Sequence, residues 1–87
     1  MASEAEIADR LKGYIEAVQD RKLDFDAAQL TGKHLINDLA MDSLDIMNFL
    51  YQVEENEKVE ISEAEMESES LYDFAKLVNH IRAKQAG

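Results

Sequence analysis

The chain has 87 residues, enough for one small domain, and we treat residues 1–87 as a single domain. Its 19 acidic and nine basic residues give a formal net charge of -10, which argues against nucleic acid as a partner because phosphate groups are neutralised by Lys and Arg. The chain has no cysteine, so it encodes no disulfide, thiolate metal ligand or thiol nucleophile. No apolar run approaches the roughly 20 residues that span a bilayer, and residues 1–10 lack the features of a signal peptide. We therefore expect a soluble, monomeric, cytoplasmic protein that does not insert into membranes.

The negative charge is concentrated between residues 38 and 73, which include 12 of the 19 acidic residues and one basic residue, Lys58. The rest of the chain has seven acidic and eight basic residues. A charge run is commonly no more than a solvated face. An excess confined to one continuous segment favours a basic partner surface, because complementary fields accelerate encounter.

The first predicted helix covers residues 4–19. Ser3 with Glu6 forms the start pattern in which a hydroxyl caps a backbone amide. Apolar residues then recur every three or four positions, as on one face of a helix; they are Ile7, Leu11, Tyr14, Ile15 and Val18.

A long connection is predicted from residue 20 to residue 39, because its apolar residues have no sustained period. A loop of this length without structure is unusual in a small domain. We therefore expect its apolar side chains to pin it onto the helices.

The second predicted helix covers residues 43–55, and Asp42 with Asp45 marks its start. Its polar residues form only a narrow wedge, so apolar residues cover most of its circumference. Such a helix is either central to a bundle or also presents an exposed apolar face. We interpret it as central, with Tyr51 exposed.

Two more helices complete the prediction. A short helix over residues 63–67 follows Ser62, and a longer one over residues 71–84 follows Ser70 with Asp73. Together these features predict an all-α fold: a small four-helix bundle of three longer helices and one short one, with a long loop between the first two.

The sequence contains no set of nucleophile, base and orienting group that would indicate an enzyme. His34 and His80 are far apart and have no carboxylate at the spacing of metal ligands. We expect both histidines to be structural or surface residues, and we predict no metal site.

Ser43 is a candidate for covalent modification because it would be the first residue of the second helix. A hydroxyl at that position points outward, where another enzyme can reach it. A helix N-terminus also accommodates a phosphate, through its free amides and the positive end of its dipole. Asp42 and Asp45, on either side, could dock a basic enzyme.

Residues 38–45 read Asp-Leu-Ala-Met-Asp-Ser-Leu-Asp, which resembles the modification motif of acyl carrier proteins, usually written D-L-G-x-D-S-L-D. Residues 35–39, Leu-Ile-Asn-Asp-Leu, are similar to the family's Phe-x-x-Asp-Leu approach to the serine. The resemblance covers nearly the whole chain, including its size, its acidity, the long first loop and the acidic second helix.

The resemblance implies that a phosphopantetheinyl transferase moves 4′-phosphopantetheine from coenzyme A onto the oxygen of Ser43. The thiol of this arm would then carry an acyl group as a thioester, so a cofactor would supply the thiol that the chain lacks. Acyl-loading and acyl-processing enzymes of a fatty-acid, polyketide or related specialised lipid pathway would be the partners.

We expect these enzymes to dock through a basic surface on the second helix, because its carboxylates would steer them to the root of the arm. The predicted partner-facing residues are Asp42, Leu44, Asp45, Asn48, Tyr51, Glu54 and Glu55. The acyl chain is expected between this helix and its neighbours, at Met47 and Leu50 on the inward side, because methionine repacks readily around variable guests.

The chain departs from the family pattern at four positions. Ala40 stands where glycine is usual, Asn48 where an acid is common, and Ser62 where proline is common. Glu57 stands where phenylalanine is usual, and we expect Val59 or Ile61 to fill that space. These departures favour a specialised, free-standing carrier over the housekeeping fatty-acid carrier.

Two alternatives stay open. One is an aminoacyl or peptidyl carrier, although residues 40–43 lack the Gly-Gly-His/Asp-Ser sequence usual in peptidyl carriers. The other is a structural subunit, an acyl-carrier-like bundle that binds partners without carrying cargo.

Overall fold

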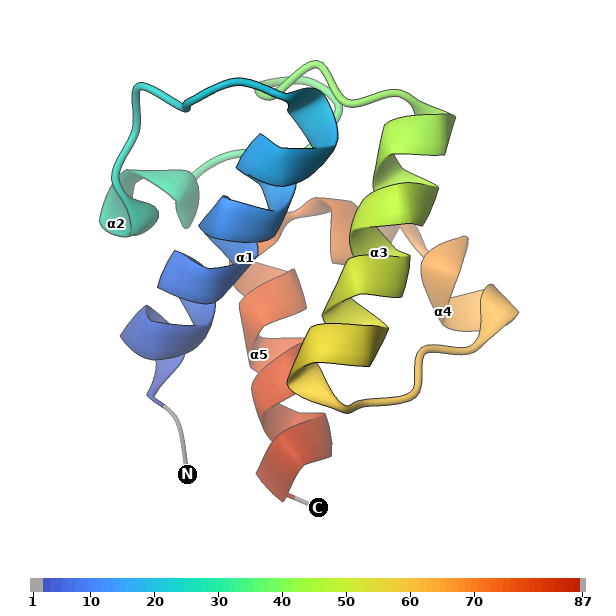
Figure 1. Cartoon of the computed structure of the whole chain (residues 1–87). Coiled ribbons are helices and arrows are strands. Elements are labelled where there is room, and N and C mark those ends of the chain that lie inside the picture. The colour runs from blue at the N-terminus through green and yellow to red at the C-terminus, as the bar shows by residue number, and fades with distance from the viewer. Residues whose placement is uncertain (1–2, 87) are drawn as a thin grey trace.

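The computed structural model describes residues 3–86, which are helical with short connections and contain no strand. The helical elements, in chain order, are α1 (Glu4–Gln19), α2 (Ala27–Leu30), α3 (Ser43–Glu57), α4 (Glu63–Met66), the 3-10 turn η1 (Glu69–Tyr72) and α5 (Phe74–Ala86). The all-α prediction is confirmed. The structure adds α2 and η1 to the four helices that the sequence predicted (Figure 1).

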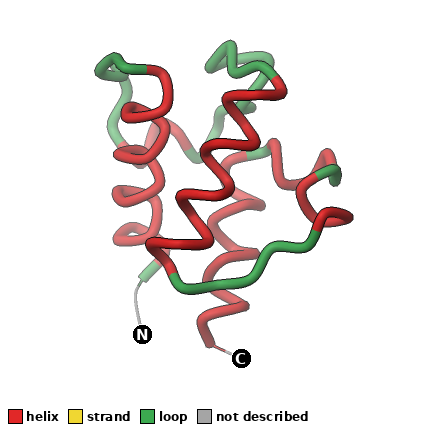
Figure 2. The backbone as a smooth tube through the Cα atoms, turned by 45° about the vertical axis from the view of Figure 1, so that its right-hand side comes forward, coloured by secondary structure: helices red, strands yellow, loops and turns green. Residues whose placement is uncertain are grey.

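The three longer helices, α1, α3 and α5, pack around a common core, with α1 in contact with both of the others. The connection between α1 and α3 crosses one end of the molecule, and α3 begins at that end (Figure 1). The start of α1 and the end of α5 lie together at the opposite end (Figure 2). The Ser43 end of α3 is therefore remote from the start of α1 and from the end of α5.

The core consists of the apolar faces of these helices and a few residues of the connections. Phe49 of α3 and Phe74 of α5 are its largest fully buried side chains. The predicted inward stripe of α1 is confirmed at Ile7, Leu11 and Ile15, while Tyr14 and Val18 are partly buried against the core.

Three of the four predicted helix starts are confirmed. The side chain of Ser3 accepts a hydrogen bond from the amide of Glu6, and reciprocal capping boxes begin α3 and α4. The start predicted at Ser70 is wrong. This residue lies inside η1, and α5 begins at Phe74, where the carboxylate of Asp73 accepts a hydrogen bond from the amide of Lys76 at 3.3 Å.

The long connection contains more structure than the sequence predicted. Asp26 and Gln29 form a capping box that starts α2. Backbone hydrogen bonds then hold the rest of the connection against the segment before α5: the Leu35 amide donates to the Tyr72 carbonyl at 2.7 Å, and the Phe74 amide donates to the Lys33 carbonyl at 3.1 Å. Buried Leu30, Leu35 and Leu39 pin the connection onto the core, as expected.

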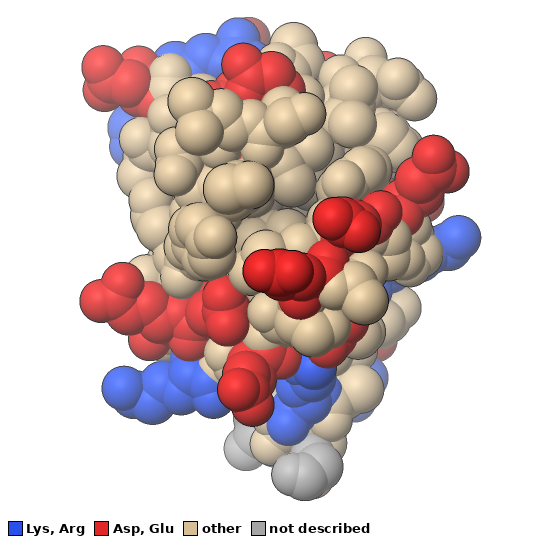
Figure 3. All heavy atoms as spheres, turned by 90° about the vertical axis from the view of Figure 1, so that its right-hand side faces the viewer, with Lys and Arg blue, Asp and Glu red and all other residues tan. Residues whose placement is uncertain are grey.

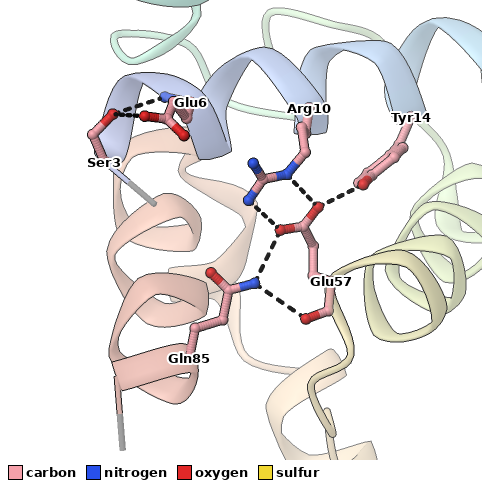
Figure 4. A network of polar contacts seen from close by, with 6 residues as sticks. All are labelled: Ser3, Glu6, Arg10, Tyr14, Glu57 and Gln85. Atoms are coloured by element: carbon pink, nitrogen blue, oxygen red, sulfur yellow. Dashed lines mark hydrogen bonds and ion pairs between the residues drawn. The ribbon is translucent and has the colours of Figure 1, made fainter. Parts of the chain in front are cut away.

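A buried carboxylate joins the three longer helices at the end of α3. Two nitrogens of the Arg10 guanidinium, Nε and Nη2, donate to the Glu57 carboxylate at 2.8 and 2.7 Å, and the Tyr14 hydroxyl and the Gln85 side-chain amide donate to it as well (Figure 4). These bonds, the pair with Arg10 above all, hold the pKa of Glu57 below its usual value. Burial and the bond to Glu57 raise the pKa of Tyr14 to about 12.

The expectation that Val59 or Ile61 fills a space left by Glu57 is therefore wrong in its premise. The Glu57 side chain itself occupies the interior, with an exposed fraction of 1%. Ile61 belongs to the buried core, and Val59 is partly buried against it. Glu57 is thus the centre of a buried polar junction between helices.

Candidate functional site at the start of α3

Ser43 is the first residue of α3, and it is exposed. The Asp42 carboxylate accepts a hydrogen bond from the amide of Asp45 at 2.8 Å, and the Asp45 carboxylate accepts one from the amide of Asp42 at 3.4 Å. This capping box fixes the first turn of the helix on both sides of the serine. The geometry places the hydroxyl at the positive end of the α3 dipole, in reach of another molecule.

The segment before Ser43 is held in a defined turn. The Leu39 carbonyl accepts hydrogen bonds from Gln19 at 2.9 Å and from Arg21 at 3.3 Å, which tie it to the end of α1. Ala40 follows with a φ of 57°, in the left-handed region that favours glycine. Glycine would adopt this backbone conformation without strain, whereas alanine holds it at a steric cost.

His34 starts this turn, and sequence reasoning assigned it no role at the site. Its ring nitrogen Nδ1 accepts hydrogen bonds from the amides of Ile36 and Asn37, each at 3.2 Å. Its own amide donates to the Asp38 carboxylate at 2.7 Å. Little in the sequence indicates this role, because histidine is not among the usual capping residues.

Helix α3 also presents an exposed apolar strip beside Ser43. Leu44, Met47 and Tyr51 are 65%, 47% and 51% exposed, at spacings of three and four residues that place them on one face. The exposure predicted for Tyr51 is confirmed. Helix α3 packs in the core as interpreted, but it also exposes Leu44 and Met47, so it buries one apolar face and exposes another.

A groove with a volume of about 450 Å³ opens between α3 and α4 next to Ser43. Met47 and Leu50 line one wall, and Met66 of α4 and Tyr72 line the other. The expectation that both Met47 and Leu50 face inward holds for Leu50, which is buried, but is wrong for Met47, which lies at the open side of the groove. The groove can accept a flexible apolar chain that starts at the serine.

The predicted partner-facing residues divide into two groups. Asp42, Leu44, Asn48, Tyr51 and Glu55 are exposed. Asp45 and Glu54 are half-buried and have structural partners: Asp45 belongs to the capping box, and Glu54 accepts a hydrogen bond from the amide of Ile61 at 3.2 Å.

The face that carries α4 combines acidic and uncharged surface. Acidic side chains form an oblique band across it, with an uncharged area above the band (Figure 3). Part of the charge is neutralised within the protein, because Lys84 forms an ion pair with the Glu65 carboxylate at 2.9 Å, and His80 also contacts this carboxylate. The hydrogen bonds from Lys84 and His80 lower the pKa of Glu65 to about 2.

A second groove, of about 550 Å³, lies between α1, α2 and α5, and its residues are distinct from those around Ser43. Small side chains such as Ala8, Ala28 and Ala75 line much of it. Within residues 3–86, no cluster of three or more His, Asp or Glu side chains could hold a metal ion. No helix of this part of the chain is long and apolar enough to cross a membrane.

Comparisons of the chain with protein-family models, with curated proteins and with solved structures find no match. A functional interpretation therefore depends on the residues and geometry of the site itself, together with the motif resemblance of residues 35–45.

Proposed function

We propose that this protein carries acyl groups as thioesters on a 4′-phosphopantetheine arm attached to Ser43. The observation that carries the proposal is the position of Ser43: an exposed hydroxyl at the start of a capped helix, at the mouth of an apolar groove. The motif around it points to the same chemistry. The bundle of α1, α3, α4 and α5 that the resemblance implies, with α2 and η1 as parts of its connections, belongs to this proposal.

Attachment of the arm is a phosphoryl-group transfer in which the protein is the acceptor. The Ser43 oxygen forms a bond to the phosphorus that carries the pantetheine, the bond to the nucleotide part of coenzyme A breaks, and adenosine 3′,5′-bisphosphate leaves. The transferase accepts the serine proton. The free amides and the dipole of α3 stabilise the resulting phosphodiester anion.

The groove between α3 and α4 supports an acyl cargo over an aminoacyl one. Met47, Leu50 and Met66 give it apolar walls, and burial of a chain there releases about 0.8 kcal/mol for each CH₂ group. An aminoacyl group would bring a charged amine, which the apolar walls do not stabilise, although the exposed carboxylates of Glu63 and Glu67 also line the groove. Methionine also adapts to guests of different lengths.

Enzymes with basic docking surfaces are the proposed partners. Exposed Asp42 and Glu55 flank the apolar strip of Leu44, Met47 and Tyr51. Carboxylates around an apolar centre provide electrostatic steering at the rim and contact area in the middle.

The test of the proposed function is intact mass after incubation with coenzyme A and a phosphopantetheinyl transferase. The wild-type protein should gain the mass of one phosphopantetheine, and Ser43→Ala should gain none. Ser62→Ala is the matched control, because Ser62 also stands at the start of a helix, and it should be modified normally.

The mass measurement on the wild-type protein, together with loading assays, also discriminates among the alternatives. A wild-type protein that gains no mass contradicts the carrier function and supports the structural subunit. Loading by an aminoacyl-activating enzyme, with none by acyl-loading enzymes, identifies the aminoacyl carrier.

A further inference from the structure

The turn that leads to Ser43 begins with a capping group that can take up a proton. Serine, threonine, aspartate and asparagine usually cap such turns, because their oxygens accept backbone hydrogen bonds. Here the acceptor is Nδ1 of His34, which receives both the Ile36 and the Asn37 amides. An imidazole nitrogen accepts these bonds only without its proton, so the ring is neutral with the proton on Nε2.

His34 also holds the turn through its backbone. Its amide donates to the Asp38 carboxylate, and its carbonyl accepts the amides of Asp38 at 2.9 Å and Leu39 at 3.2 Å. The next residues in the chain are Ala40, with its left-handed backbone, and buried Met41, whose amide donates to the Leu35 carbonyl at 3.0 Å. The turn therefore continues without a break into the capping box that presents Ser43.

We propose that His34 is a positioning residue for Ser43, a proton-sensitive cap that holds the serine segment in its modifiable form when the ring is neutral and releases it on protonation. Protonation of Nδ1 replaces an acceptor with a donor. The ring then confronts the two amide donors, and both hydrogen bonds are lost. The consequence for modification rests on the proposed function, whereas opening of the turn does not.

Charged and aromatic residues from two segments of the chain surround His34. Asp38 lies on its own turn, and Asp73 faces it across an isolated backbone bridge. Lys33 precedes it in the chain, and the ring of Tyr72 lies edge-on to the His34 ring at 6.3 Å between centroids.

The first experiment measures the turn itself, by hydrogen-exchange protection of the Ile36 and Asn37 amides in the unmodified protein. Protection in the wild type should fall about tenfold between about pH 7.5 and about pH 5.5, as the two capping bonds are lost. His34→Ser supplies a cap that does not titrate, so its protection should stay constant. His80→Gln is the matched control, because His80 is the second of the two histidines, and it should behave like the wild type.

The second experiment measures the rate of phosphopantetheine transfer to the same proteins over the same pH range. Because the transferase has its own pH profile, the quantity compared is the ratio of the His34→Ser rate to the wild-type rate. This ratio should rise about fivefold on acidification. His34→Ala, which has no cap, should be slow at both pH values.

Parallel exchange profiles for the wild type and His34→Ser would overturn the proposal, as would a constant rate ratio. If His34→Ser does not fold, His34→Asn provides a second cap without a titrating group. A protein that shows the expected exchange profile but accepts no arm contradicts the proposed function and leaves the proton-sensitive cap supported.

Discussion

At the scale of single residues, Ala40 has a strained, left-handed backbone conformation beside the site. A left-handed conformation costs an L-residue about 1–2 kcal/mol, a penalty that glycine does not have. Replacing Ala40 with glycine would remove this penalty, but part of the benefit is offset because glycine is more flexible in the unfolded chain. The protein retains a strained residue three positions before Ser43.

Replacement of this residue should stabilise the protein. We expect Ala40→Gly to raise the free energy of unfolding by about 0.5–1 kcal/mol, measured by urea denaturation. Ala17→Gly is the control, because Ala17 is exposed within α1 and should lose about 1 kcal/mol. A loss of similar size in both variants would show that strain at Ala40 is negligible.

Glu57 is a second single residue with a large expected effect. Its carboxylate is buried, so removal of its charged partner leaves an uncompensated charge in the interior. Arg10→Ala should therefore lower the free energy of unfolding by about 2–4 kcal/mol. Arg82→Ala removes an ion pair of exposed side chains and should cost less than about 1 kcal/mol; equal losses would contradict a special role for the buried junction.

The same carboxylate predicts a dependence of stability on pH. Its pKa is lower in the folded protein than in the unfolded chain, so its contribution is present above the usual glutamate value of about 4.3 and disappears as the pH falls through the folded value. The difference in stability between wild type and Glu57→Gln should therefore shrink on acidification below about pH 4. Denaturation of both proteins over this range measures the difference, and a constant difference would contradict the coupling.

At the scale of elements, α3 combines a buried face with an exposed one, and this division decides how docking can be tested. Reversal of charge at Asp45 or Glu54 would alter folding as well as docking, because the Asp45 carboxylate accepts the amide of Asp42 and the Glu54 carboxylate accepts that of Ile61. Glu55 is exposed on the same helix and is therefore the better probe.

Glu55→Lys should reduce the specificity constant of the transferase or loading enzyme by up to about fivefold, the usual value of one exposed ion pair. Asp24→Lys makes the same change in net charge at an exposed position in the first connection, and it should have little effect. Equal losses in both would mean that only net charge matters, and the docking surface on α3 would be wrong.

Helix starts were the most predictable elements, because a cap is a local pattern. The pairs at Ser3, Asp42 and Ser62 identified α1, α3 and α4 from spacing alone. Helix α2 followed the same rule with Asp26 and Gln29, and the sequence signal was present but unused. Ser70 satisfied the pattern and yet starts no α-helix, because a 3-10 turn competes for the same residues.

Features that depend on distant partners could not be read from the sequence. The partners of Glu57 include Arg10, which precedes it by 47 positions. From the sequence, the resemblance indicated only that phenylalanine is usual at this position, and it gave no sign of a buried carboxylate. The turn at His34 likewise depends on a backbone bridge to Asp73. Within the site, the spacing of the motif located Ser43. The exposure of Met47 could not be predicted in this way, because it depends on how α4 packs beside α3.

At the scale of the whole molecule, residues 38–73 concentrate the acidic charge, and α3, α4 and η1 all lie within this segment. Repulsion of this kind is screened beyond about 8 Å at physiological ionic strength. Stability should therefore rise with salt, and each kcal/mol gained should raise the melting temperature by about 4–8 °C. A flat or falling melting temperature between low and moderate salt would contradict this; in the double variant Glu60→Gln and Glu67→Gln, the rise should be smaller.

The placement of the start of α1 and the end of α5 has a practical consequence for how the protein can be held. Both lie opposite the Ser43 end of α3 (Figures 1 and 2). A purification handle, a dye or a flexible tether joined to either end would extend away from the serine, so the protein could be fixed to a bead or a sensor chip by its base. Ser43 and the groove beside it would then face the solution, open to one visiting enzyme after another.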